Sequence, residues 1–382
     1  MILRLALACA PPDDPPLPTD PVAPEPPTLQ LTSEVLDVPP GSPQHHATVA
    51  IRPDGVAIGA WRGRGRTDAL RLADGRGEPL QLATLAPVNH PQVRATDDGY
   101  LVVATMDQAR GLAGVAVAAG AREVYGAVIL EAGLAALLPD LDVRGDQGLL
   151  VWGEPDGIHC VAFTGAFEDQ RPAACPQADG VVYSVTARLG EGRTAFAWDA
   201  LRADGFETVV AVDRGDGPVA EVLAAGSTVP GRPGVAVDDA SGRHTVVWTA
   251  SASDDDPVSA WLATYDPDGA LQAGPLPLGH APGAASVTWP TLAGPLDGQL
   301  LLAWVEGDAL WLQLRDAATG EPVGEPLDAA ADFDGAALRP SVDVAQPPDG
   351  GLIGIVSWET PIDGAVYDTD RTLHVRTFAL LP

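Results

Sequence analysis

The stretch Leu296-Asp297-Gly298-Gln299-Leu300-Leu301-Leu302-Ala303-Trp304 joins an acidic glycine turn to an apolar run that ends on tryptophan. The same pattern is written seven times along the chain. Its last position is held in turn by Trp61, Thr105, Trp152, Trp198, Trp248, Trp304 and Trp358, at steps of 44 to 56 residues. A period of this length indicates one supersecondary unit that is repeated.

Each repeat contains the signals of four short strands. An alternating strand precedes the turn, as at 235–237 and 342–344, and the apolar run follows it. A third strand comes after a variable loop, as at 310–314, and a weaker fourth is punctuated by proline, as at 79–85. Continuous apolar runs suit strands that are covered on both faces. Four-stranded units of this kind predict an all-β fold, a seven-bladed β-propeller.

The two ends of the repeat region predict how the ring closes. The last repeat stops after its third strand, near 373–378, whereas an unassigned strand at 28–35 precedes the first repeat. We expect this N-terminal strand to complete the seventh blade, since closure removes the free sheet edges that promote aggregation. The propeller would then be a single domain over residues 28–382.

The residues ahead of the repeats form two different segments. Residues 1–9, MILRLALAC, resemble the end of a bacterial lipoprotein signal, which implies that Cys9 is lipidated. Ala6 stands where that pattern usually has leucine, and the apolar part is short for a signal peptide. An incidental cysteine in a disordered N-terminus is the alternative. Residues 10–27 are rich in proline and aspartate, which predicts an extended, disordered tether.

The two remaining cysteines favour an exported protein. Cys160 and Cys175 are 15 residues apart, the first on a strand of the third repeat and the second in a proline-rich loop. Two isolated cysteines lack the paired spacing of a zinc site. We therefore expect a disulfide in an oxidising compartment, either the bacterial cell envelope, with a lipid anchor, or the secreted fraction.

One repeat carries a resemblance to known sequences. Arg232-Pro233-Gly234-Val235-Ala236-Val237-Asp238, Thr245-Val246-Val247-Trp248 and Trp261-Leu262-Ala263-Thr264-Tyr265-Asp266-Pro267-Asp268-Gly269 resemble the tryptophan-bearing, propeller-type repeats of many exported bacterial surface proteins. The resemblance extends over about residues 28–382 at the level of the repeat. It implies a propeller and export, and it assigns no catalytic residue, because such folds host many unrelated functions.

The charge balance limits the classes of partner. The formal net charge is −30, and every Lys or Arg position is an arginine. Such a protein repels phosphate backbones and anionic lipid, which makes nucleic acid an improbable partner. No apolar run approaches the roughly 20 residues that span a bilayer, so we expect membrane contact only through the lipid anchor. We expect a monomer whose partner is a protein or glycan at the cell surface.

Residues at the entry of each first strand form the first candidate site. This position usually precedes a proline, and around the ring it is occupied by His46, His90, Leu138, Tyr183, Arg232, Trp289 and Arg339. If the first strands line the channel, these side chains gather at one mouth of it. Arginines bind anions by paired hydrogen bonds and aromatic rings stack on sugars, so an anionic or sugar-like ligand is expected there. The alternative is that they only cap the channel.

A second ring follows the tryptophan position. It consists of Arg62, Asp107, Glu154, Asp199, Glu306 and Glu359. Neighbouring carboxylates can bind Ca²⁺, the one cofactor that this pattern suggests. No segment has the D-x-D-x-D-G spacing of a calcium loop, however, and solvated loop carboxylates are the alternative. The aspartates at 254–256 and Asp363, Asp368 and Asp370 lie in long loops of the same kind.

Motifs of enzymes are mostly missing from the sequence. There is no G-x-S-x-G, no H-E-x-x-H, no phosphate-binding glycine loop and no CxxC pair. The sequence therefore favours a binding or scaffolding propeller of the cell envelope, without an assigned catalytic residue. The alternative is a glycan-active hydrolase or lyase, for which Arg232, Arg339, Glu306 and Glu359 would supply the charged groups. A purely structural envelope protein is a third possibility.

Overall fold

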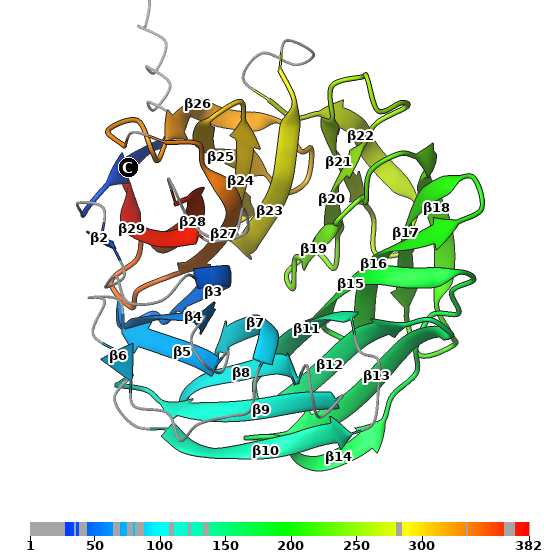
Figure 1. Cartoon of the computed structure of the whole chain (residues 1–382), viewed down its shortest axis with the longest axis horizontal. Coiled ribbons are helices and arrows are strands. Elements are labelled where there is room, and N and C mark those ends of the chain that lie inside the picture. The colour runs from blue at the N-terminus through cyan, green and yellow to red at the C-terminus, as the bar shows by residue number, and fades with distance from the viewer. Residues whose placement is uncertain are drawn as a thin grey trace, which may run out of the picture.

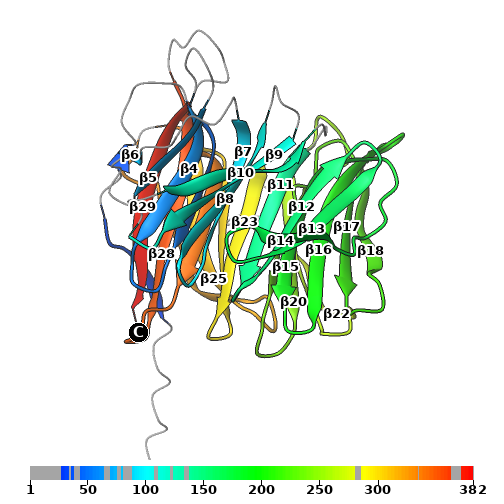
Figure 2. The same cartoon turned by 90° about the horizontal axis from the view of Figure 1, so that it is seen from below.

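The computed structural model describes residues 27–33, 36–37, 44–63, 69–74, 79–80, 88–106, 111–120, 124–132, 137–279, 285–333, 335–362 and 371–381. Within these ranges all regular structure is β-strand, and the strands form seven antiparallel sheets. The sheets follow one another in chain order around a central axis (Figure 1). Seen from the side, they stand next to one another with their strands steeply inclined to the plane of the ring (Figure 2). The predicted all-β propeller fold is confirmed.

Six of the sheets are built from four strands that are consecutive in the chain. The first two are β3 (Gln44–Ile51), β4 (Ala57–Gly63), β5 (Ala69–Asp74) and β6 (Pro79–Leu80), and β7 (Val88–Ala95), β8 (Gly99–Met106), β9 (Gly111–Ala118) and β10 (Val124–Ala132). The next two are β11 (Leu137–Arg144), β12 (Gln147–Glu154), β13 (Gly157–Thr164) and β14 (Glu168–Pro172), and β15 (Val181–Gly190), β16 (Arg193–Arg202), β17 (Gly205–Asp213) and β18 (Val219–Ser227). The last two are β19 (Gly234–Val237), β20 (His244–Ala250), β21 (Ser259–Tyr265) and β22 (Leu271–Pro277), and β23 (Val287–Leu296), β24 (Gln299–Glu306), β25 (Ala309–Asp316) and β26 (Pro322–Asp328).

The remaining sheet joins the two ends of the described chain. It contains β27 (Leu338–Ala345), β28 (Leu352–Pro361), β29 (Arg371–Leu381) and, beyond β29, the N-terminal strand β1 (Thr28–Leu31). β1 is antiparallel to β29, with Thr28 opposite Leu381 and Leu31 opposite Phe378. The short strand β2 (Leu36–Asp37) pairs with β29 further along. In Figure 1 the blue N-terminal strands accordingly lie beside the red strand β29.

The repeated tryptophans pack between neighbouring sheets. Trp304 is fully buried in a cluster that contains Val287 and Leu292 of its own sheet and Ala236 and Val247 of the preceding one. The other five tryptophans at this position and Thr105 are buried as well. Because the apolar second strands are covered on both faces, their sequences need not alternate. The tryptophan repeat in the sequence therefore marks the positions at which one sheet packs against the next.

Several predicted segments lie outside the described residues. They include the signal-like segment 1–9 with Cys9, nearly all of the tether 10–27, and Asp107, Asp363, Asp368 and Asp370. The predicted fourth strand at 79–85 is described only over Pro79–Leu80. Among the residues that the structure does describe, no helix is long and apolar enough to cross a membrane.

Candidate functional site

The first strand of each sheet faces a cavity on the central axis. The cavity has a volume of about 300 Å³ and is bordered by β3, β7, β11, β15, β23, β27 and the segment leading into β19. All seven residues predicted to gather at a channel mouth are among its lining residues: His46, His90, Leu138, Tyr183, Arg232, Trp289 and Arg339. An adjoining cavity of about 230 Å³ is lined by six of the seven, without Tyr183. The structure thus brings the predicted ring together.

Six of these seven residues share an unusual backbone conformation. His46, His90, Leu138, Arg232, Trp289 and Arg339 have φ between 30° and 55°, in the left-handed region that favours glycine. Five of them lie at a register shift between the first and second strands of their sheet. Each such residue costs of order 1–3 kcal/mol unless the surroundings enforce it. In five of the sheets the bulge therefore presents one side chain to the cavity.

Hydrogen bonds between neighbouring sheets hold the strained backbone in place. The N–H groups of Ala47, Val49 and Ile51, on alternate residues of β3, donate to side chains of the sheet formed by β27–β29. The acceptors are Glu359 at 3.0 Å, Ser341 at 3.2 Å and Asp343 at 2.9 Å, in that order. These contacts satisfy an inner strand edge that would otherwise lack partners.

The same arrangement recurs elsewhere in the ring. The N–H groups of Ala187 and Leu189 on β15 donate to Asp140 at 3.3 Å and Asp142 at 2.7 Å on β11. The N–H group of Arg232, just ahead of β19, donates to Asp199 on β16 at 3.2 Å. Carboxylates of one sheet thus fix the inner strand of the next.

Two arginines and one indole dominate one side of the cavity mouth. The guanidinium carbon Cζ of Arg232 lies 3.4 Å from the centroid of the Trp289 ring, and that of Arg339 lies 5.3 Å from the same ring. Arg339 also donates to Glu359 over 3.4 Å. Among the described residues Arg232 forms no ion pair. Burial, with the nearby positive charge of Arg339, lowers the pKa of Arg232 to about 10, even though Tyr183 and Asp199 act against the shift.

Two histidines occupy another part of the mouth. The rings of His46 and His90 are 4.1 Å apart between centroids, and the Nδ1 atom of His46 is 2.8 Å from the Oδ1 atom of Asn89. Burial lowers the pKa of His90 to about 4, and the positive charges of Arg339, Arg62 and Arg232 add to the shift. His90 is therefore neutral at pH 7, with one ring nitrogen that donates a hydrogen bond and one that accepts.

A buried ion-pair cluster forms another part of the cavity lining. Asp140 is 3.1 Å from the Nη2 atom of Arg94 and 2.6 Å from the Nη1 atom of Arg188, and it accepts a 2.6 Å hydrogen bond from Thr186. Burial alone would raise the pKa of Asp140, but Arg188 and Arg94 hold it below its usual value. The Asp140 charge is thus neutralised internally, while Arg232 faces the cavity without such a partner.

Five further residues line the cavity without having been predicted from the sequence: Gln92, Arg94, Asp140, Arg188 and Thr291. A signal for some of them was present. In a strand, residues two apart share a face, so Gln92 and Arg94 follow His90 toward the axis, and Thr291 follows Trp289 in the same way. Extending the ring positions by steps of two would have predicted these polar linings, although not their ion pairs.

Among the members of the second predicted ring that the structure describes, no three carboxylates lie close enough to share a metal ion. Asp199 lies within β16 and Glu359 within β28, and both are fully buried, so the expectation of solvated loop carboxylates is wrong for these two. Burial raises the pKa of both carboxyl groups. Hydrogen bonds to Asp199 oppose the shift of its pKa, and the positive charge of Arg339 opposes that of Glu359. Arg62 lies near enough to His90 to affect its pKa.

The other two carboxylates of this ring lie at strand ends. The indole N–H groups of Trp152 and Trp304 donate to Glu154 at 2.8 Å and to Glu306 at 3.5 Å. Among the described residues, one group of possible metal ligands lies close enough to share an ion, namely Glu154, Asp156 and His159. A Ca²⁺ site shared by the whole ring remains a sequence-based prediction.

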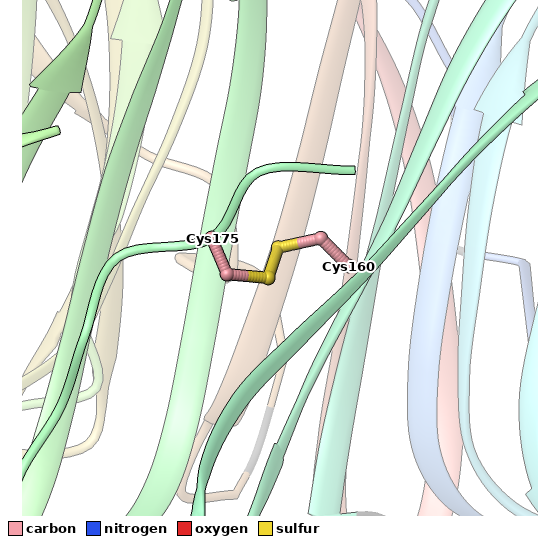
Figure 3. The surroundings of a disulfide bond; sticks show 2 residues. All are labelled: Cys160 and Cys175. Carbon is pink, nitrogen blue, oxygen red and sulfur yellow. A yellow bond between two sulfur atoms is a disulfide. The ribbon is translucent and has the colours of Figure 1, made fainter. Parts of the chain in front are cut away.

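The predicted disulfide is confirmed. Cys160 on β13 is bonded to Cys175 in the loop after β14, with their Cα atoms 5.8 Å apart (Figure 3). The bond ties the outer part of this sheet to the segment that leads into β15. It lies away from the cavity lining, so its role is structural.

One of the comparisons with known proteins, that with a fungal lectin, supports the fold. No protein-family model matches the chain, and no curated protein matches its sequence. A mutant of the Aleuria aurantia lectin AAL, solved in complex with Fucα1-6GlcNAc, matches with a TM-score of 0.50 and 9% identity, over 77% of this chain and 100% of the lectin chain. The WD40 domain of SCAP from fission yeast matches with a TM-score of 0.49 and 8% identity, over 90% of this chain and 97% of that domain.

A further match is a mutant of the GH43 protein BlXynB from Bacillus licheniformis, with a TM-score of 0.38 and 11% identity, over 64% of this chain. The match spans 54% of that chain, about half of its length. At these identities a structural likeness shows the fold alone. The protein is a β-propeller, and its function has to be argued from its own residues.

Proposed function

We propose that this protein is a binding propeller that holds an anionic ligand at the mouth of its central channel. One observation carries the proposal: Arg232 and Arg339 flank the same indole ring at a 300 Å³ cavity, in a chain whose net charge is −30. Arg339 is paired with Glu359, whereas the half-buried Arg232 has no ion pair among the described residues. A cation that is partly removed from water without a counter-charge is costly. An anion between the two guanidinium groups would remove that cost and gain charge-assisted hydrogen bonds.

The framework of the proposed site is a seven-bladed propeller closed by the N-terminal strand. Support comes from the seven sheets of the described residues and from the pairing of β1 with β29. In this arrangement β1 takes the outer position that β6, β10 and their counterparts take in the other blades. A closed ring keeps the first strands at fixed positions around the axis, and the site depends on this.

Thermal unfolding with added ligands tests the proposal. We expect acetate, phosphate or glucuronate to raise the melting temperature of the wild type, because a ligand that binds only the native state stabilises it by roughly 2.7 kcal/mol at 100 times its Kd. Arg232→Ala should lose this shift. Arg144→Ala is the matched control, since Arg144 forms an exposed ion pair with Asp239. Equal shifts in all three proteins, or none, would contradict the proposal.

A glycan-active hydrolase or lyase is the second candidate. The observation in its favour is that burial raises the pKa of Glu359, which also lies 3.4 Å from Arg339 beside the cavity. A carboxyl group with a raised pKa is what a general acid of glycoside hydrolysis requires. Turnover of a chromogenic glycoside that is lost in Glu359→Gln would establish this candidate. Ligand binding without turnover would favour the binding propeller over the enzyme.

We further propose that the protein works outside the cytoplasm, secreted or lipid-anchored through Cys9 at the bacterial cell envelope. The Cys160–Cys175 disulfide supports an oxidising compartment. Metabolic labelling with a fatty acid should mark the wild type and leave Cys9→Ser unmarked. The proposed partner is a glycan or protein of the cell surface. If none of the ligands tested changes the melting temperature, a purely structural role is favoured.

A further inference from the structure

The cavity combines a cationic side with uncharged hydrogen-bonding groups. We infer that its ligand is a sugar acid of monosaccharide size, with its carboxylate between Arg232 and Arg339 and its hydroxyl groups toward His90, Gln92 and Thr291. This inference rests on the proposed function and specifies the ligand class of the same site. A simple inorganic anion or a neutral sugar would use only half of the available contacts.

The carboxylate position follows from the two arginines. The Cζ atoms of the two guanidinium groups lie 3.4 and 5.3 Å from the centroid of the same Trp289 ring, so we expect one planar anion to contact both groups. Asp140, which also lines the cavity, is already paired with Arg94 and Arg188. Arg339 is paired with Glu359, so the charge of Arg232 is the one left for the ligand to compensate. Arginine favours planar carboxylates because its fork matches their geometry.

The hydroxyl position follows from groups that the fold does not use. Gln92 on β7 and Thr291 on β23 line both cavities, and the structure gives neither side chain a hydrogen bond to another described residue. His90, on the same strand as Gln92, is neutral and contributes a donor and an acceptor. An amide, a hydroxyl and a neutral imidazole are the partners that the hydroxyl groups of a sugar require.

The size of the cavity limits the ligand. The volume of the main cavity, about 300 Å³, lies at the lower end of the range for small-molecule sites, which starts near 300 Å³, and the adjoining cavity, about 230 Å³, is smaller still. One sugar ring is therefore favoured over an extended chain. The indole of Trp289 at the mouth is suited to cover the apolar face of the sugar. Alternatively, the indole remains stacked with Arg232 and orients its guanidinium group.

Calorimetry with a matched ligand set tests the inference on the whole chain. The probes are glucuronate, glucose, acetate and inorganic phosphate. Glucose has no carboxylate and acetate has no hydroxyl groups, so we expect glucuronate to bind at least about tenfold more tightly than either. Acetate or phosphate binding as tightly as glucuronate would overturn the sugar acid and leave the anion site intact. Failure of all four probes to bind would overturn both proposals.

Two sets of variants locate the contacts. Arg232→Gln should weaken glucuronate and acetate alike, because both use the carboxylate contact. Gln92→Leu and Thr291→Val should weaken glucuronate and leave acetate unchanged. If these two variants bind glucuronate as the wild type does, the hydroxyl contacts are wrong. Melting temperatures without ligand show whether each variant is folded, and Arg144→Ala again serves as the surface control.

Discussion

His244 should make the fold acid-sensitive between pH 6.5 and 4. Its ring is buried and stacked 5.0 Å from Tyr265, and neither ring nitrogen has a hydrogen-bond partner among the described residues. Burial lowers the pKa of His244 from 6.5 to about 4. The negative charge of Asp266 opposes this shift and the positive charge of Arg193 adds to it. The unfolded chain therefore binds a proton at pH 5, whereas the folded protein does not.

The sign and size of the effect follow from this difference. The stabilising contribution is fully present above pH 6.5 and is lost as the pH falls toward 4. A shift from 6.5 to about 4 corresponds to about 2 kcal/mol lost by pH 5 and about 3 kcal/mol by pH 4. These values are of the order of a fifth of the stability of an ordinary domain or more.

The assay is urea unfolding of the wild type and of His244→Phe at several pH values from 8 to 4. Phenylalanine keeps the stack on Tyr265 and cannot bind a proton. All other titrating groups are common to both proteins, so the difference between the two stability curves isolates His244. We expect the wild type to lose about 2 kcal/mol more than the variant between pH 8 and pH 5. Parallel curves would refute the reasoning.

The remaining predictions concern the framework and the charged groups. Replacing Cys160 and Cys175 by serine should cost about 3 kcal/mol, as expected for a 15-residue loop, and lower the melting temperature. Deleting residues 28–37 should lower it sharply and promote aggregation in light scattering, because β29 would lose its outer partner; an unchanged melt would exclude closure. Asp140→Asn should destabilise the fold by about 3 kcal/mol in urea, since the half-buried Arg94 and Arg188 lose their nearest counter-charge. If Ca²⁺ binds at Glu154, EDTA should lower the melting temperature of the wild type and not of Glu154→Gln.

The sequence predicted the features that each repeat encodes by itself. The tryptophan period located the second strands, because each tryptophan occupies the same buried position between sheets. The residue at the start of the first strand could be located in every copy, and six of the seven residues there share one backbone conformation. The disulfide could be proposed because its two cysteines lie close in sequence.

Contacts between repeats could not be read in the same way. Asp140 meets Arg94 and Arg188, which are 46 and 48 residues away, and nothing in either local sequence names the partner. The burial of Asp199 and Glu359 was missed for the same reason, since each accepts from an N–H group of the next sheet. Pairings of this kind depend on how the sheets pack, and a repeat pattern gives only their order.

The six left-handed residues at the channel mouth make the site adjustable one position at a time. At His46 and Arg232 a backbone hydrogen bond to a neighbouring sheet fixes the chain at or next to the left-handed residue, and it does not involve the side chain that this residue displays. An exchange at His46, Leu138 or Trp289 should therefore alter what the channel recognises while the ring keeps its shape. A library varied at these positions could be selected for new ligands without redesigning the scaffold.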